Sequence, residues 1–147
     1  INWTMTVAWN KIMEKIVDNL IRFHHIGIAC VDMEKEINYY QIMGYEYDGI
    51  EYIDKNLGIK CRFLNGGGPR IELVVEYNSN VLQPYLKNNS KIYHMAFKTK
   101  KIFDTINNLK KYGYKIIIEP TPAIAFSNKS VCFLMSPTMS LIEIIEN

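Results

Sequence analysis

Two histidines and two glutamates stand at matching positions in the two halves of this 147-residue sequence. The two sets are His25 with Glu72 and His94 with Glu143. Both histidines are followed nineteen positions later by a Gly-Tyr dipeptide, and both glutamates stand between two aliphatic residues. One such match would carry little weight, but all of them in the same order indicate an internal duplication that retained its polar residues.

Two imidazoles and two carboxylates are a typical ligand set for nickel, cobalt, iron, manganese or zinc, and suit calcium poorly. Two neutral imidazoles and two carboxylates also balance a charge of +2, so that burying the ion costs little net charge. On an octahedral ion, four protein ligands leave two adjacent positions for waters or substrate oxygens. Such an ion acts as a Lewis acid and stabilises the enediolate that forms when a C–H beside a carbonyl loses its proton. A glutamate that loosens from the ion is suited to take that proton.

The alternation of strand side chains predicts that these four residues share one face. In the first strand, His25 and Gly27 point away from the side that an aliphatic set turns toward a helix. Glu72 and Glu143 likewise alternate with aliphatic neighbours and face the same open side. The repeat offset selects His25 rather than the adjacent His24, and alternation then predicts His24 on the opposite face.

The elements that must position these residues are predicted to form an α+β fold of two tandem βαβββ modules, at residues 23–76 and 92–146. In the first module we expect strands Phe23–Val31, Tyr45–Ile53, Ile59–Leu64 and Arg70–Glu76, and a helix over Met33–Met43. In the second we expect strands Ile92–Lys98, Tyr114–Ile118, Ser130–Met135 and Leu141–Glu146, and a helix over Lys101–Lys111. A polar loop near Tyr77–Ser90 joins the modules, and residues 23–147 are expected to form one domain with a cleft-lined, paired sheet.

Residues 1–22 are predicted to be a helical extension with an apolar stripe. The stripe is expected to pack against the rest of the domain or against a second copy of the chain, and comprises Ile12, Met13, Ile16, Val17, Leu20 and Ile21.

The composition argues against several classes of protein. A formal charge of +2 with scattered basic residues gives no basic stripe for nucleic acid and no polybasic block for a membrane surface. The three cysteines form no CxxC motif and are expected to be reduced, buried packing residues of a cytoplasmic protein.

The sequence resembles the vicinal oxygen chelate superfamily, whose members are built from paired βαβββ modules. The matching segments are His25-Ile26-Gly27-Ile28-Ala29, Ile71-Glu72-Leu73, Tyr93-His94-Met95-Ala96-Phe97 and Leu141-Ile142-Glu143-Ile144. The resemblance is strongest to methylmalonyl-CoA epimerase and the short bacterial glyoxalase I proteins. It implies that His25, Glu72, His94 and Glu143 ligate a divalent metal, with nickel or cobalt favoured and zinc, iron or manganese as alternatives. It also implies that Glu143, with Glu72 opposite, moves the substrate proton, and that the protein is a homodimer.

The expected activity is that of an epimerase-like isomerase or a glyoxalase I-like lyase acting on an acyl thioester or a hemithioacetal. Departures from the epimerase pattern at Ser136–Ser140 and Pro120–Lys129 leave the choice between these substrates open. One alternative is a metal-free, bleomycin-resistance-like protein that binds a small molecule in the same cleft. Another is an accessory domain of a larger biosynthetic enzyme.

Other residues near the predicted cleft have less certain roles. Arg62 and Arg70 are candidates to hold a substrate carboxylate or phosphate, with solvated strand positions as the alternative. The segment with Pro120 and Pro122 is expected to be a plain loop, with a lid as the alternative.

Overall fold

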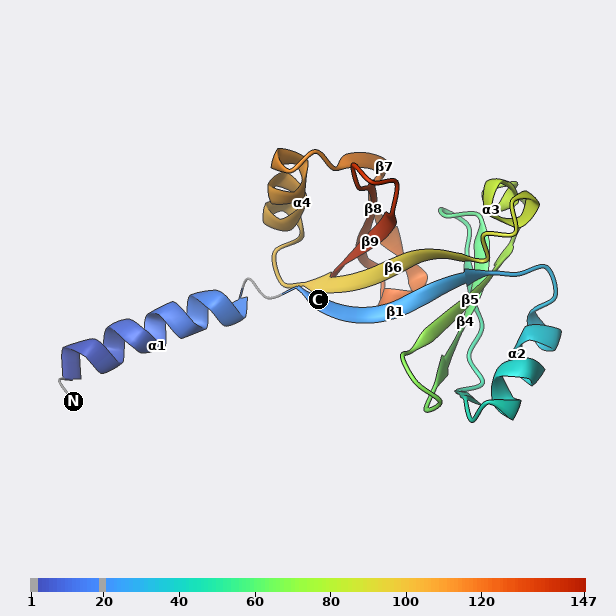
Figure 1. Ribbon diagram of the computed structural model, residues 1–147, viewed down its shortest axis with the longest axis horizontal. Coiled ribbons are helices and arrows are strands. Elements are labelled where there is room, and N and C mark those ends of the chain that lie inside the picture. Colours follow the sequence, from blue (N-terminus) through green and yellow to red (C-terminus); the bar gives the residue numbers. More distant parts are fainter. Residues whose placement is uncertain (1–2, 19–20) are drawn as a thin grey trace.

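The chain folds into two βαβββ modules preceded by a helix, as Figure 1 shows, and the predicted fold class is confirmed. The computed structural model describes residues 3–18 and 21–147. The first module comprises β1 (Arg22–Ala29), α2 (Met33–Ile42), β2 (Glu46–Tyr47), β3 (Tyr52–Asp54), β4 (Ile59–Asn65) and β5 (Ile71–Glu76). The short helix α3 (Gln83–Lys87) lies between the modules. The second module comprises β6 (Ile92–Thr99), α4 (Ile102–Lys111), β7 (Lys115–Ala123), η1 (Ile124–Phe126), β8 (Lys129–Met135) and β9 (Leu141–Glu146).

The strands of both modules join into one nine-stranded sheet with the order β2-β4-β5-β1-β6-β9-β8-β7, while β3 pairs with β4 off this path. The first strands of the modules, β1 and β6, run antiparallel at the centre, and each has the last strand of its own module parallel on its outer side. Gly27 pairs with Glu72 on one side of the centre, and Ala96 pairs with Glu143 on the other. The duplication is therefore preserved as an approximate twofold relation about the β1–β6 pair.

Each module packs its helix against one face of its own strands. Met33 and Ile37 of α2 join a core cluster with Ile28, Cys30 and aliphatic residues of β4 and β5. Ile102 and Ile106 of α4 make the equivalent cluster with β8 and β9. Because these clusters take the aliphatic residues of each strand, the alternating positions are left on the opposite face.

Three segments differ from the sequence-based prediction. The predicted strand Tyr45–Ile53 is divided into β2 and β3, since the Ile50 N–H donates to Asp48 Oδ1 at 3.0 Å and Gly49 takes a φ of +84°, a region that favours glycine. The expected polar loop at Tyr77–Ser90 contains α3, anchored by the buried Leu82.

The third difference concerns Pro120 and Pro122, which lie inside β7 rather than in the predicted loop or lid. The strand β7 is the last in the sheet order, where a proline without an N–H is tolerated. Its pairing with β8 shifts register between Ile118 and Thr121, around the first of these prolines.

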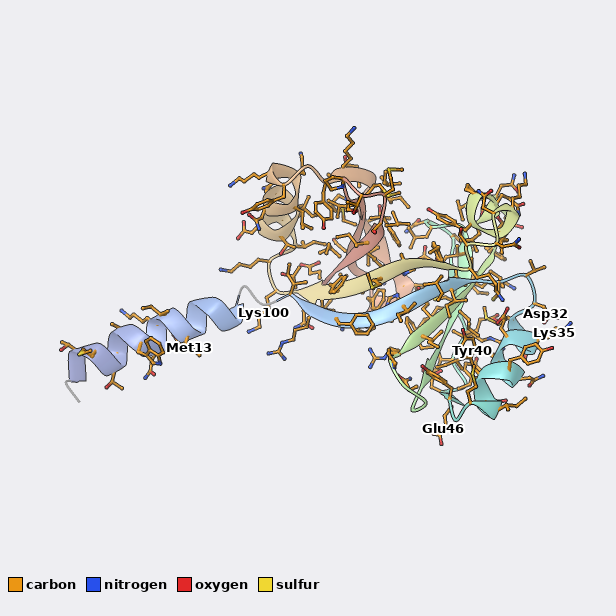
Figure 2. All side chains as sticks on the ribbon, in the orientation of Figure 1. Met13, Asp32, Lys35, Tyr40, Glu46 and Lys100 are labelled. Atoms are coloured by element: carbon orange, nitrogen blue, oxygen red, sulfur yellow. The ribbon has the colours of Figure 1, made fainter. Side chains whose placement is uncertain are left out.

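The N-terminal helix α1 (Trp3–Asp18) stands away from the sheet in Figure 1. Ile12 and Met13 of the predicted stripe are exposed, and Figure 2 shows Met13 on this separate helix. Leu20 and the side chains of Ile16 and Val17 lie outside the described residues, so the predicted packing of this stripe stays a prediction. No helix within residues 3–18 and 21–147 has both the length and the apolar character needed to cross a membrane.

Candidate metal centre

Four buried side chains from the two modules converge on the face opposite the helices. His25 comes from β1, Glu72 from β5, His94 from β6 and Glu143 from β9. All four are at most 5 % exposed, and one ligand atom from each lies within 4.8 Å of the others. The structure thus brings together all four residues that the duplication predicted.

The imidazole nitrogens and the carboxylate oxygens face one another at short range. His25 Nε2 lies 3.1 Å from His94 Nε2, 3.1 Å from Glu72 Oε2 and 3.3 Å from Glu143 Oε2. His94 Nε2 lies 3.4 Å from each of the same two carboxylate oxygens. Each histidine therefore contacts the carboxylate of its own module and that of the other.

The electrostatics of the cluster couple the four groups. Burial by itself lowers the pKa of His25, but the carboxylates of Glu72 and Glu143 outweigh it and raise that pKa to about 9. The same carboxylates raise the pKa of His94 against the effect of burial. Burial likewise opposes ionisation of the two glutamates, but the histidines lower the pKa of both. The histidines thus stabilise the negative charge of the two buried carboxylates.

A divalent cation fits this donor set. With ligand distances of about 2.1 Å, neighbouring ligands on one ion lie about 3 Å apart, close to the separations seen among these donors. Glu143 Oε2 is buried and makes no hydrogen bond of good geometry in the described part of the chain, although His25 Nε2 and His94 Nε2 lie 3.3 and 3.4 Å away. A +2 ion held by His25, Glu72, His94 and Glu143 would coordinate that oxygen and balance the charge of the two carboxylates.

Gly27 provides the space that the imidazole of His94 occupies. The two residues are cross-strand partners, and a Cβ atom on Gly27 would lie 2.0 Å from His94 Cε1 and 2.3 Å from His94 Nδ1. These distances are well inside van der Waals contact. The glycine is required here because the ring of His94 lies directly over its Cα.

A β-bulge precedes each of the two histidines. In the β1–β6 pairing, Phe23 and His25 oppose adjacent residues of β6, so that His24 is an extra residue on β1. In the same pairing, His94 and Ile92 oppose adjacent residues of β1, so that Tyr93 is the extra residue on β6. The two bulged residues are repeat equivalents at the offset of 69 that relates the histidines.

The first bulge corrects the prediction that His24 lies on the face opposite His25. Because a bulge interrupts the alternation of side chains, both histidines turn to the same side, and His24 Nδ1 lies 2.8 Å from His25 Nδ1. Burial, reinforced by His25 and the cation of Arg70, lowers the pKa of His24 to about 4. His24 is therefore a neutral ring that contacts the non-ligating nitrogen of His25.

The second bulge brings Tyr93 to the equivalent place beside His94, with the ring centroids 4.4 Å apart. Burial and the carboxylates of Glu72 and Glu143 raise the pKa of Tyr93 well above its usual value. Two phenylalanines complete the walls, since Phe63 pairs with Glu72 and contacts the ring of His25, and Phe133 occupies the corresponding place beside Glu143 and His94.

Sequence reasoning missed the role of the short helix η1. Its Phe126 ring stacks parallel to His25 at a centroid distance of 6.1 Å and contacts His24 edge-to-face. The buried Asp54 of the first module holds η1 in place, since its two carboxylate oxygens accept hydrogen bonds from the N–H groups of Leu57 and Ile124 at 2.9 and 3.2 Å. No periodic signal marks this contact in the sequence, because it joins two irregular segments.

Arg62 and Arg70, the two arginines that the sequence suggested for substrate binding, have different surroundings. Arg62 forms ion pairs with Glu34 and Glu51 and lies over the ring of Tyr47, so the expectation that it serves the cleft is wrong. Arg70 lines a pocket next to the cluster and contacts His24 Nε2.

The cysteines are buried and free, as predicted. Cys61 lies on β4 near the metal-ligand cluster, and burial together with Glu72 raises the pKa of its thiol well above the usual range. Cys61 is not one of the four residues whose ligand atoms converge within 4.8 Å.

The fold and the cluster define a class of protein. The chain belongs to the glyoxalase/bleomycin resistance protein/dioxygenase superfamily, whose sequence pattern it matches over residues 24–133. This match confirms the resemblance drawn from the sequence.

Among solved structures, the hypothetical protein BH1468 from Bacillus halodurans C-125 is 27 % identical, with a TM-score of 0.73 over 86 % of this chain and 94 % of that one. Methylmalonyl-CoA epimerase from Mycobacterium tuberculosis is 22 % identical, with a TM-score of 0.73 over 85 % and 87 % of the two chains. Streptomyces coelicolor methylmalonyl-CoA epimerase, in complex with 2-nitronate-propionyl-CoA, is 21 % identical, with a TM-score of 0.66 over 86 % and 96 %. At these identities the epimerases share the fold of this chain. The comparison with curated proteins found no match.

Proposed function

We propose that this protein is a divalent-metal-dependent enzyme that transfers a proton beside a carbonyl group, either as a glyoxalase I-like lyase or as a methylmalonyl-CoA epimerase-like isomerase. The observation that carries the proposal is the convergence of two histidines and two glutamates, all buried, from repeat-equivalent strands of two modules. A duplicated core has no packing reason to bury such a set twice, since each buried ionisable group costs free energy unless it is paired.

The four residues have distinct tasks in this proposal. His25 and His94 hold the cation through their Nε2 atoms, while Glu72 and Glu143 supply the balancing negative charge. When bound, the ion supplies Lewis-acid chemistry that stabilises negative charge on a carbonyl oxygen. Glu143 would also accept the proton of the adjacent C–H, since a carboxylate that loosens from the ion is suited to act as a general base.

The second carboxylate explains how an isomerase or lyase returns the proton. Glu72 and Glu143 come from β5 and β9, the last strands of opposite modules, and flank the β1–β6 pair from its two sides. A substrate placed between them presents one face of its reacting carbon to each carboxylate. One glutamate accepts the proton and either the same or the opposite one returns it.

The finer assignments rest on the family resemblance. Nickel or cobalt is the proposed cation, with zinc, iron and manganese as alternatives, and the proposed substrate is an acyl thioester or a hemithioacetal. The structural neighbours include epimerases solved in complex with methylmalonyl-CoA and with 2-nitronate-propionyl-CoA. A homodimer and a cytoplasmic location are part of the same proposal.

A metal-reconstituted assay tests the function. The protein is stripped with a chelator, loaded separately with nickel, cobalt, zinc, iron or manganese, and assayed on methylmalonyl-CoA and on a thiol–methylglyoxal hemithioacetal. Glu143→Gln removes the proposed proton acceptor and is expected to lower turnover by about 10²- to 10⁴-fold, the range for loss of a general base. The matched control is Glu46→Gln on the edge strand β2, where Figure 2 shows Glu46 at the periphery.

Three results would overturn the proposal. The first is turnover by Glu143→Gln equal to that of Glu46→Gln. The second is a protein that binds none of the five metals, which would support the metal-free binding alternative. The third is a loaded protein that turns over neither substrate.

A further inference from the structure

A pocket of about 340 Å³ opens beside the metal-ligand cluster on the side of His25. Its lining includes His24, Phe63 and Phe126, three of the rings that contact the imidazole of His25. Arg70 and Lys98 also line it. A group held in this pocket therefore lies next to a proposed metal ligand.

The pocket carries more positive than negative charge. Its cations are Arg70, Lys98 and Lys129, and its anions are Asp48 and Glu146. Both anions already accept hydrogen bonds from backbone N–H groups, Asp48 from Ile50 and Glu146 from Ser130.

The cations lie close enough to repel one another. Burial, with Lys129 and Arg70, lowers the pKa of Lys98. The Arg70 guanidinium is oriented by its Nε, which donates to Asn65 Oδ1 at 2.9 Å, and it touches His24 Nε2.

The equivalent place in the second module has the opposite character. The pocket next to His94, of about 260 Å³, is bounded by Tyr93 and Phe133 and otherwise mainly by aliphatic residues, without a lysine or arginine. The twofold relation that holds for the four proposed ligands therefore does not extend to the two pockets beside them. The pocket beside His25 is lined by cations, and the pocket beside His94 is mainly apolar.

We propose that the pocket formed by His24, Arg70, Lys98 and Lys129 binds an anionic group of the substrate, a carboxylate or a phosphate, while the reacting carbonyl lies at the metal centre. This inference rests on the proposed function and adds to it the substrate class: a carbonyl compound that carries an anionic arm. It also assigns the orientation, since the anionic arm lies on the His25 side and the apolar part on the His94 side. Arg70 is suited to the contact because its planar guanidinium pairs with two oxygens of a carboxylate or phosphate.

Anion binding to the metal-free protein tests the pocket without any assay of turnover. Calorimetric titrations with inorganic phosphate and with malonate are made on the chelator-treated protein, so that neither probe binds through a metal. Both anions are expected to bind, and the tighter of the two identifies the arm as phosphate or carboxylate. Arg70→Gln and Lys98→Gln are each expected to weaken binding about tenfold, as for loss of one charge-assisted hydrogen bond. The control is Lys35→Gln, an exposed lysine of α2 (labelled in Figure 2) that is not among the residues lining the pocket.

The outcomes separate this inference from the proposed function. Failure of both probes to bind, or equal binding by all three variants, overturns the anion pocket even if the metal-loaded enzyme is active. Binding that Arg70→Gln and Lys98→Gln weaken and Lys35→Gln leaves unchanged supports the pocket even if the metal-dependent assay fails.

Discussion

Replacing Gly27 by alanine tests whether the close approach of β1 to His94 builds the metal centre. The added Cβ would lie 2.0, 2.3 and 2.5 Å from Cε1, Nδ1 and Nε2 of His94. Ordinary contact is about 3.5–4.0 Å, so the ring must move by about 1.5 Å or the two strands must separate. The ring has little room for this movement, since Tyr93 and Phe133 pack edge-to-face against it.

The expected result is a large loss of metal affinity with a moderate loss of stability. Overpacking of this kind costs about 1–3 kcal/mol of folding free energy. Loss of the alignment of one ligand is expected to weaken metal binding by at least the 10- to 100-fold seen when a residue that only orients a ligand is removed. Affinity is measured by competition with a chromophoric chelator for zinc and nickel, and stability by urea unfolding of the metal-free protein.

Gly44→Ala is the matched control. Gly44 has a φ of +92°, and among residues 3–18 and 21–147 no atom lies within 4 Å of the position of an added Cβ. Alanine there therefore costs about 1–2 kcal/mol of backbone strain without touching the site. Both variants are then destabilised, but only Gly27→Ala loses the metal. Equal metal affinity in the two variants would refute the reasoning, because it would mean that His94 does not depend on the missing Cβ.

Two further predictions follow from the charges and hydrogen bonds around the site. Because the pKa of His25 is raised to about 9, this ring is protonated in the metal-free protein at pH 7, and metal binding at its Nε2 should release a proton. The apparent affinity for the metal should rise as the pH rises toward 9 and fall below pH 7. Calorimetry in buffers of different ionisation enthalpy counts the protons that are released. Release of no proton would contradict the charges assigned to the cluster. Asp54→Ala leaves the N–H groups of Leu57 and Ile124 unpaired and should lower the free energy of unfolding by about 1–3 kcal/mol, with faster amide exchange at Ile124. The control Asp48→Ala, in an exposed turn, should lower it by less than about 1 kcal/mol. Equal unfolding free energies would show that Asp54 does not hold η1.

Much of the fold could be predicted because the sequence carries its pattern twice. In each module the aliphatic alternation identifies the helix side of the strands, so the glutamate between two aliphatic residues had to face the other way. The glycine stops after both helices and the shared offset of 69 then identified the histidines, even though His24 competes with His25 for the role. The duplication supplied the information that an alignment of relatives would otherwise provide.

The alternation of strand side chains does not determine the position of a bulge, the partners of Arg62 or the contact made by Phe126, and the sequence did not predict these features. A bulge adds one residue to a strand, and nothing in Phe23-His24-His25 marks the place. The position of the Arg62 side chain depends on its ion pairs with Glu34 and Glu51, which only the tertiary structure brings near it. Phe126 reaches the site through a one-turn helix held from the other module, a contact between distant segments with no local signal.

The paired bulges explain how one duplicated scaffold holds a symmetric His/Glu cluster, the proposed metal ligands, between two pockets of unlike lining. In each module a bulge turns the residue before the clustered histidine, His25 or His94, to the same side as that histidine. The backbone conformation at this point is therefore equivalent in the two modules. The residue at that position then differs, since His24 contacts Arg70 and borders the cationic pocket, whereas Tyr93 borders the apolar one. A substitution at a bulge therefore alters the wall of the cleft next to a ligand without altering the ligand set.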